Sequence, residues 1–186
     1  MARYRIVPEQ SVAWIDARSS VHPIHSRTEG LSGFFEAEVS PGGAVHVDAP
    51  LSGAVELPVD RLSSGNPLYD REMKRRVDSR RHPTISGVLG SMQSSGTEGS
   101  YRMSGEVTFR GVTCPVEGEM TITTPSERTL CLEGEHVFDV RRWGMDPPKL
   151  MLLKVYPDVT VRVRIVASRQ ADSDSDGAAP GPPGNR

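Results

Sequence analysis

The sequence predicts an all-β fold, an antiparallel barrel of about eight strands with one short amphipathic helix. Three observations lead to this prediction. Apolar and polar residues alternate with a period of two over most of residues 3–167, one segment changes to helical spacing, and glycines interrupt the apolar face. A period of two gives each strand one polar and one apolar face, and about eight such strands can close around an interior.

The clearest alternation runs from Val45 to Val59, where every second residue is apolar or glycine. We expect one very long strand here, bent at Pro50 or Gly53. Further strands are predicted by alternation at 101–110, 116–123, 130–138 and 159–165, and by shorter patterns at 11–17, 20–26, 34–40 and 84–92. Segments rich in Pro, Gly and Ser, such as Ser40–Gly43 and Thr124–Glu127, predict the turns between them.

One segment departs from the strand pattern. Tyr69, Met73 and Val77 are spaced four residues apart, with charged residues between them and Pro83 soon after. This spacing predicts an amphipathic helix that ends near Asp78. We expect it to lie against a barrel end or across an open side.

Composition limits the classes of function. The formal net charge is −2, which gives no overall field for nucleic acid, and the longest apolar run, Leu150–Leu153, is too short to cross a bilayer. The first residues lack the pattern of a secretory signal, so we expect a cytoplasmic protein. Residues 3–167 are the expected folded domain, and 168–186, rich in Gly, Pro, Ser and Asp, an expected disordered tail.

The two cysteines are expected to stay reduced. If residues 124–128 form a hairpin turn, Cys131 lies opposite Thr121 and Cys114 near Phe138, too far apart for a disulfide.

The inward glycines raise the question of a cavity. Gly53, Gly105, Gly118 and Gly134 share the apolar face, and aromatic residues make up only 5% of the chain. A barrel of about eight strands can hold one small ligand when its side chains do not fill it. The alternative is a packed core in which these glycines are kinks.

Three segments together resemble a known family. They are GNPLYDREMKRRVDSRRHPTISG, GEVTFRGVTCPVEGEM, and the ending from LEGEHVFDVRRWGMDPP to VRVRIVA. Over residues 45–167 these resemble the YceI-like family, most clearly at Arg110–Val116, Asp70–Met73 and Phe138–Gly144. The resemblance implies an extended lipocalin-like barrel with a long channel that binds polyisoprenoid-type lipids, with no catalytic centre, cofactor or metal. Family members are often homodimers and many are exported, so a homodimer is a further expectation.

If the apolar faces point inward, they provide the candidate ligand-binding residues. These are Trp14, Phe35, Val55, Leu89, Met103, Val107, Phe109, Met120, Leu132, Phe138 and Val163. A register slip of one residue would reverse any of these assignments. His136 is either a hydrogen-bonded core residue or a contact for a ligand head group. Trp143 and Met151 form either an apolar rim at the channel mouth or an internal cap.

The predicted helix carries the candidate polar contacts. Arg71 and Arg75 could bind an anionic head group or a membrane surface, because a guanidinium group can form a bidentate contact with two phosphate oxygens. The alternative is a solvated helix face.

Two other functions are compatible with the same pattern. One is a surface interaction module with a filled barrel. The other is a hydrolase of small apolar esters, although no nucleophile-elbow, phosphate-loop, dinucleotide or zinc-protease motif occurs. His22 and His25 would point to opposite faces of a strand, which disfavours a shared metal.

Overall fold

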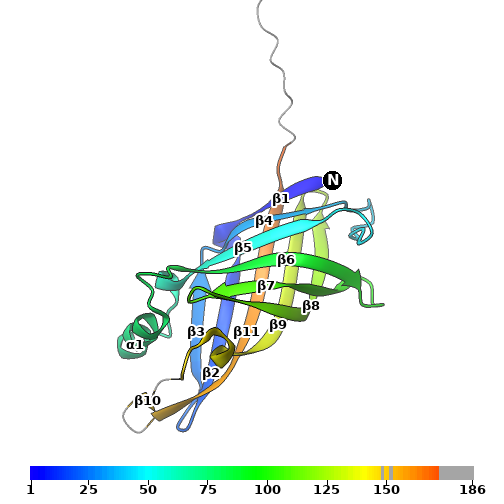
Figure 1. Ribbon diagram of the computed structural model, residues 1–186. Helices are drawn as coiled ribbons and strands as arrows, with labels where there is room; N and C mark the ends of the chain where they lie inside the picture. Colours follow the sequence, from blue (N-terminus) through cyan, green and yellow to red (C-terminus); the bar gives the residue numbers. More distant parts are fainter. Residues whose placement is uncertain (148, 151–152, 172–186) are drawn as a thin grey trace, which may run out of the picture.

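The computed structural model describes residues 1–147, 149–150 and 153–171. Figure 1 shows strands wrapped into a barrel, with a single α-helix beside one end. The strands are β1 (Ala2–Ile6), β2 (Val12–Ser19), β3 (Ile24–Glu29), β4 (Ser32–Ala37), β5 (Ser52–Pro58), β6 (Thr84–Ser94), β7 (Ser100–Phe109), β8 (Val112–Ser126), β9 (Thr129–Asp139), β10 (Lys149–Leu150) and β11 (Leu153–Arg169). The helix α1 spans Pro67–Val77, and short 3-10 turns occur at η1 (Pro8–Gln10), η2 (Val59–Arg61) and η3 (Val140–Trp143).

The barrel closes through eight antiparallel strands. Neighbouring strands follow the order β1-β4-β5-β6-β7-β8-β9-β11, and β1 returns to pair with β11, with Ile6 opposite Ala167. The predicted all-β barrel of about eight strands with one helix is therefore confirmed.

The wall continues beyond this ring on one side. The edge of β11 that meets β1 also pairs with β2, and β2 pairs with β3. The break between β1 and β2 is stabilised by buried Ser11, whose hydroxyl donates to the carbonyl of Val7 (2.8 Å) and accepts from the amide of Val166 (3.0 Å).

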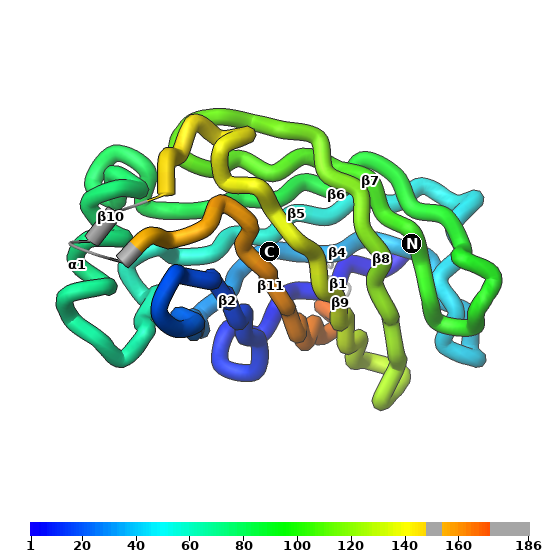
Figure 2. Tube along the Cα trace, turned by 90° about the horizontal axis from the view of Figure 1, so that it is seen from below, coloured from blue at the N-terminus to red at the C-terminus, as the bar shows by residue number. Residues whose placement is uncertain are grey.

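The helix forms as the sequence predicts and lies beside this continuation of the wall. The side chain of Asn66 accepts a hydrogen bond from the Leu68 amide, and Asp78 ends the helix in the left-handed conformation (φ 53°). Backbone hydrogen bonds between Arg27 and Ser63, of 2.9 and 3.1 Å, attach the preceding segment to β3. Figure 2 shows α1 and β10 at the same end of the molecule.

The prediction of one long strand from Val45 to Val59 is wrong. Only Ser52–Pro58 forms a strand, and Val45 makes an isolated bridge with Val39. The backbone turns between His46 and Ala49, whose amide donates to the His46 carbonyl. Alternate burial persists without a strand, because buried Val45 covers the barrel interior while His46 faces solvent.

Other boundaries shift by a few residues. The predicted strand at 20–26 begins at Ile24, because the Ser19 hydroxyl accepts from the amides of Val21 and His22 and holds a turn before Pro23. Residues 168–169, expected in the tail, pair with β1 as the end of β11, whereas residues 172–186 lie outside the described residues.

The cysteine register also differs from the prediction. Cys131 lies opposite Thr123, not Thr121, because the β8–β9 pairing shifts before its turn. Cys114 lies on β8 opposite Val107, and both thiols are free.

Candidate functional site

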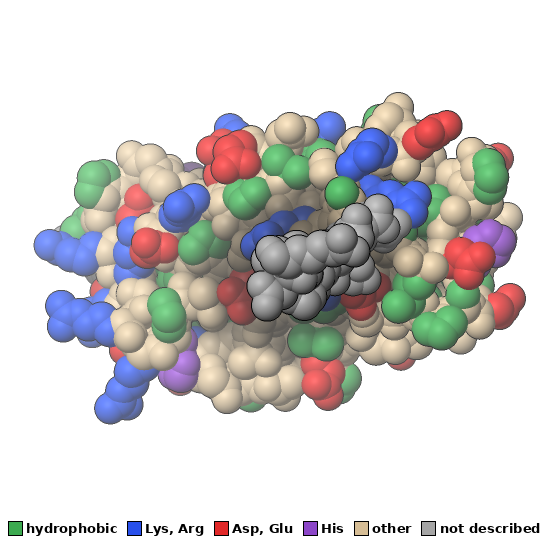
Figure 3. Space-filling view, turned by 90° about the horizontal axis from the view of Figure 1, so that it is seen from above, with side chains coloured by type: hydrophobic (Ala, Val, Ile, Leu, Met, Phe, Trp, Pro, Cys, Tyr) green, Lys and Arg blue, Asp and Glu red, His purple; other side chains and the backbone are tan. Residues whose placement is uncertain are grey.

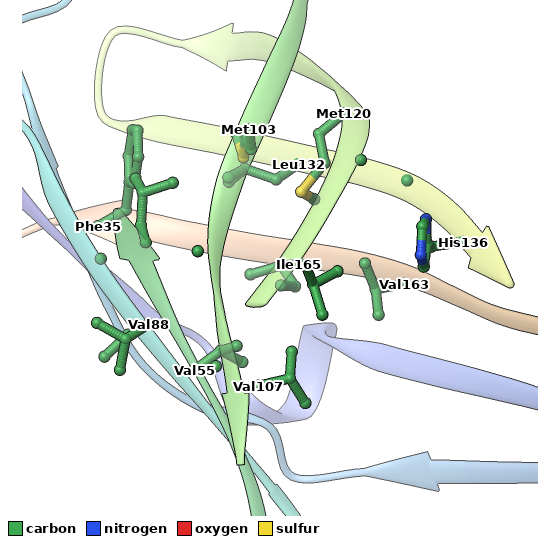
Figure 4. Close-up of a pocket in the computed structure, with 18 of the residues that line it drawn as sticks. Phe35, Val55, Val88, Met103, Val107, Met120, Leu132, His136, Val163 and Ile165 are labelled. Atoms are coloured by element: carbon green, nitrogen blue, oxygen red, sulfur yellow. The ribbon is translucent and has the colours of Figure 1, made fainter. Parts of the chain in front are cut away.

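The barrel interior contains two cavities. The first, which we call the inner cavity, has a volume of about 260 Å³ and is bounded by β1, β4–β9 and β11. Its lining includes Phe35, Val55, Leu89, Met103, Val107, Met120, Leu132, His136, Phe138, Val163 and Ile165. Figure 4 shows apolar side chains from several strands around this space, with His136 at one side.

The second cavity lies next to α1, and we call it the helix-side cavity. Its volume is about 310 Å³. Strands β2, β3, β5, β6, β7, β9 and β11 form its wall together with α1 and η3. Its apolar lining includes Ile15, Ala17, Ile24, Leu57, Met73, Ile85, Phe109, Trp143, Met145 and Val159.

The two cavities meet at a shared ring of residues, which we call the waist: Val55, Gly87, Val107, Phe138 and Val161 line both cavities. The Phe138 ring makes edge contacts with His136 (4.7 Å between centroids) and Trp143 (5.8 Å). The buried Trp143 indole donates a 2.9 Å hydrogen bond to the Val107 carbonyl. The waist is thus held in place by aromatic packing and one backbone contact.

The lumen is hollow and not filled by its own side chains. Val55, Val107, Phe138 and Val163 point inward, yet each remains only half-buried. A close-packed core would bury them almost completely. Their remaining exposed surface therefore belongs to the cavity.

The inward glycines have two different roles. A Cβ placed on Gly118 would meet only the His136 Nδ1 atom, at 3.6 Å, so this glycine leaves space. A Cβ on Gly105 would lie 2.2 Å from the Val88 carbonyl oxygen, so this glycine permits close approach of two strands. The cavity interpretation therefore holds at Gly118, whereas Gly105 is required by the close pairing of β6 and β7.

His136 is the polar ring among these apolar side chains. Within the described part of the chain no group hydrogen-bonds its ring nitrogens, and the ring packs edge-on against Phe138. A satisfied core histidine would have such a partner. The imidazole is therefore available to a polar group inside the lumen.

The two carboxylates of the helix-side cavity, Asp70 and Glu72, already have protein partners. Asp70 accepts from the Ser64 amide (2.7 Å) and from the hydroxyls of Ser64 (2.6 Å) and Ser63 (2.9 Å). Burial raises the Asp70 pKa, but these hydrogen bonds outweigh it, and the net pKa lies below its ordinary value. Hydrogen bonds from Arg75 and Arg76 lower the pKa of Glu72 to about 2. Both carboxylates are ionised near neutral pH, which makes them unsuited to donate a proton.

Most of the predicted lumen residues line the two cavities. The inner cavity is lined by Phe35, Leu89, Met103, Met120, Leu132, His136 and Val163. The helix-side cavity is lined by Phe109 and Trp143. Both cavities are lined by Val55, Val107 and Phe138.

The lumen residue Trp14 and the head-group candidates Arg71 and Arg75 lie outside both cavities, and one predicted residue is not described. Trp14 is on the opposite face of β2 from Ile15, which lines the helix-side cavity, and the Arg162 guanidinium lies 5.0 Å from its ring centroid. Arg71 and Arg75 line neither cavity, and Arg75 instead pairs with Glu72. Met151 lies outside the described residues.

Sequence reasoning missed Ile15 and the cavity-lining role of Met73. The helical spacing had already placed Met73 on an apolar face, but nothing in it showed that the face covers a cavity. For Ile15, a parity error of one residue on β2 selected Trp14 instead.

The described residues contain no group of three or more His, Cys, Asp or Glu side chains placed to hold a metal ion. Among them no helix has both the length and the apolar character needed to cross a bilayer.

A closed antiparallel barrel around an apolar lumen defines a lipocalin-like β-barrel, a class whose interior can hold a small ligand. The chain belongs to the YceI-like family, because the sequence model of the YceI-like domain matches residues 4–167. No curated protein sequence matches it significantly.

Solved structures share the fold at low sequence identity. BcnA of Burkholderia cenocepacia superposes with a TM-score of 0.70 at 14% identity, covering 87% of this chain and 98% of its own. A polyisoprenoid binding domain from Saccharophagus degradans, implicated in plant cell wall breakdown, gives 0.70 at 9% identity, covering 91% and 100%. The YceI protein of Campylobacter jejuni gives 0.63 at 9% identity, covering 80% and 86%.

Proposed function

We propose that the protein binds and carries one apolar, chain-like molecule, an isoprenoid or a related lipid, in its lumen and catalyses no reaction on it. The observation that carries this proposal is the pair of apolar cavities that share the lining residues of the waist. The shape suits a long, thin ligand more than a compact one.

The length of the lumen supports a chain-like ligand. On β11, lining residues run from Val155 through Val161 to Ala167. At about 3.3 Å per residue this stretch extends roughly 40 Å along the strand. A linear molecule threaded through the waist would contact both cavities at once.

The apolar lining supplies the driving force. Burial contributes about 0.8 kcal/mol per CH₂ group, so ten methylenes would contribute on the order of 8 kcal/mol before the costs of association. The flexible side chains of Met103 and Met120 can adapt to the shape of such a chain. The His136 imidazole can hydrogen-bond a hydroxyl, carbonyl or similar group on the ligand.

The hollow interior disfavours a surface module with a filled barrel. A hydrolase would need an activated nucleophile or a carboxylic acid with a raised pKa. The two carboxylates beside the helix-side cavity, Asp70 and Glu72, instead have lowered pKa values.

Two further parts of the proposal concern the setting of the protein. We place it in the cytoplasm, where free thiols such as those of Cys114 and Cys131 stay reduced. We also propose that the protein is a homodimer. Cell fractionation tests the location, and light scattering of the purified protein tests the dimer.

Organic extraction of the purified protein followed by mass spectrometry tests the ligand proposal. The waist variant Val161→Trp fills the passage between the cavities, and Val137→Trp, on the outer face of the neighbouring β9, is its matched control. Wild type and V137W should yield an apolar chain-like molecule, and V161W should yield at least about tenfold less. Val55→Phe, from β5, repeats the block on another strand.

Circular dichroism verifies that each variant is folded. The proposal fails if wild-type protein releases no such molecule and takes up no linear isoprenoid alcohol. It also fails if folded V161W and V55F retain as much as V137W.

A further inference from the structure

The surface at the α1 end of the molecule differs in charge from the barrel wall. Residues 70–81 contain six Lys or Arg and three Asp or Glu, although the whole chain has a formal net charge of −2. Figure 3 shows Lys and Arg side chains projecting from the end where α1 lies.

Two of these acidic groups already have hydrogen-bond partners within the protein. Glu72 pairs with Arg75 (2.8 Å) and Arg76 (2.9 Å), and Asp70 is occupied by Ser63 and Ser64. No carboxylate in the described part of the chain forms an ion pair with Arg71 or Arg80, which are both exposed. The end therefore keeps an excess of positive charge.

The barrel wall is different, because its charges are matched in pairs. Arg102 lies 3.6 Å from Glu119, and Arg164 lies 3.2 Å from Glu133. These pairs join neighbouring strands and leave little net charge on that part of the wall.

Exposed apolar side chains accompany the positive charge. Val21 is 69% exposed, Leu68 54% and Tyr156 38%. They come from the β2–β3 turn, α1 and β11, three segments far apart in sequence. We call this set of three residues the apolar tip.

Hydrogen bonds show that these segments lie together. The His22 ring contacts the Tyr69 hydroxyl at 3.2 Å, which joins the turn to α1. The backbone of Ser20 donates to the Lys154 carbonyl at 2.8 Å, which joins the same turn to β11. The side chains of Arg18 and Lys154 both lie 5.8 Å from the Tyr156 ring centroid, so the tip carries further positive charge.

The helix-side cavity reaches the same place. Tyr156 is part of its lining and also part of the exposed apolar tip, and Tyr69 lines it from α1. A molecule leaving this cavity would emerge beside the apolar tip and the basic helix.

We propose that this end of the barrel docks on the surface of an anionic lipid bilayer, with the helix-side cavity facing the membrane. Positive side chains attract anionic head groups, and exposed aliphatic and aromatic side chains enter the interfacial region. The inference rests on the proposed function, since docking would let an apolar ligand pass between bilayer and lumen without crossing water.

Vesicle co-sedimentation tests the docking. One set of vesicles contains phosphatidylcholine alone, and the other contains equal amounts of phosphatidylcholine and phosphatidylglycerol. We expect binding to the mixed vesicles only, weakening as salt is raised. Arg71→Gln with Arg80→Gln should weaken it about fivefold for each arginine removed. Arg102→Gln with Arg164→Gln, on the wall, removes the same charge and should change binding little.

A second pair of variants tests the apolar contact. Leu68→Ser should weaken vesicle binding severalfold, whereas Val137→Ser, which is equally exposed on the wall, should not. The docking would be overturned by equal binding to both vesicle types or by no binding to either. It would also be overturned if the tip variants and the wall variants lost binding equally. A dimer that L68S dissociates, without vesicle binding, would also overturn it and would identify a second copy of the chain as the partner.

The lumen-blocked variant V161W separates this inference from the proposed function. It should lose the extracted lipid but still bind the mixed vesicles. Lipid in the wild-type extract without vesicle binding would overturn the docking alone. Vesicle binding without any lipid in the extract and without uptake would overturn the carrier function.

Discussion

The two ends of the barrel are built in different ways. At the end where β1 and β11 meet, the interior is filled by residues such as Leu130, Ile122 and Tyr101, each at most 4% exposed. Toward α1, inward residues such as Val107 and Phe138 are only half-buried around the two cavities.

This difference separates stability from binding within one continuous sheet. The filled end gains the burial and dispersion energy that fixes the barrel. The hollow end forgoes part of that energy and leaves apolar surface for another molecule to cover. Substitutions of the same type at the two ends should therefore have different consequences, and this gives three tests of the comparison.

The largest expected effect comes from matched leucine truncations. Leu130→Ala, in the filled end, should lower the free energy of unfolding by about 2–5 kcal/mol, because it leaves a new cavity in a packed core. Leu89→Ala, in the inner cavity, should cost only about 1 kcal/mol, because Leu89 already faces open space. Urea denaturation of both variants measures the difference, and equal losses would show that the lumen is filled in solution.

Two tyrosine hydroxyls give a smaller effect. The buried Tyr101 hydroxyl accepts a 2.9 Å hydrogen bond from the Val45 amide, so Tyr101→Phe should cost about 1–3 kcal/mol by leaving this buried N–H without a partner. Tyr69→Phe removes the exposed contact with His22 and should cost less than about 0.5 kcal/mol. Thermal unfolding compares the two; a larger cost for Y69F would contradict the proposed contrast between the ends.

The smallest effect concerns acid stability at the α1 end. Because the Arg75 and Arg76 hydrogen bonds lower the folded-state pKa of Glu72 to about 2, its stabilising contribution is fully present above its unfolded-state pKa, near 4.5. That contribution should be lost as the pH falls from about 4.5 toward 2. Melting temperatures measured across this range should fall less steeply for Glu72→Gln than for wild type. Identical slopes would show that the pairing does not persist in solution.

The fold was largely predictable because it depends on local patterns. The period of two defined the strands after Tyr101, and the spacing of Tyr69, Met73 and Val77 defined the helix. The segment from Val45 to Leu51 misled the prediction, because alternate burial also occurs in a turn packed against the barrel. The period of a hydrophobic pattern alone does not reveal which backbone groups form hydrogen bonds with a neighbouring strand.

The candidate site was predictable only in part. Strand parity identified inward residues such as Met103 and Val163 once the register was right, but Trp14 shows how a shift of one residue reverses an assignment. The positions of Arg71 and Arg75 depend on how α1 packs on the wall, where Val77 and Met73 join a cluster with residues of β2, β6 and β7 that are distant in sequence and that composition does not encode.

The methionine methyl groups provide the most direct measurement of the central claim. Met103 and Met120 line the inner cavity, Met73 and Met145 line the helix-side cavity, and Met92 is buried in the filled end. In methyl NMR spectra of ligand-stripped protein titrated with a linear isoprenoid alcohol, the four cavity methionines should shift and saturate together while Met92 stays nearly unchanged. Cavity signals that do not respond, or a shift of Met92 as large as theirs, would contradict the carrier account.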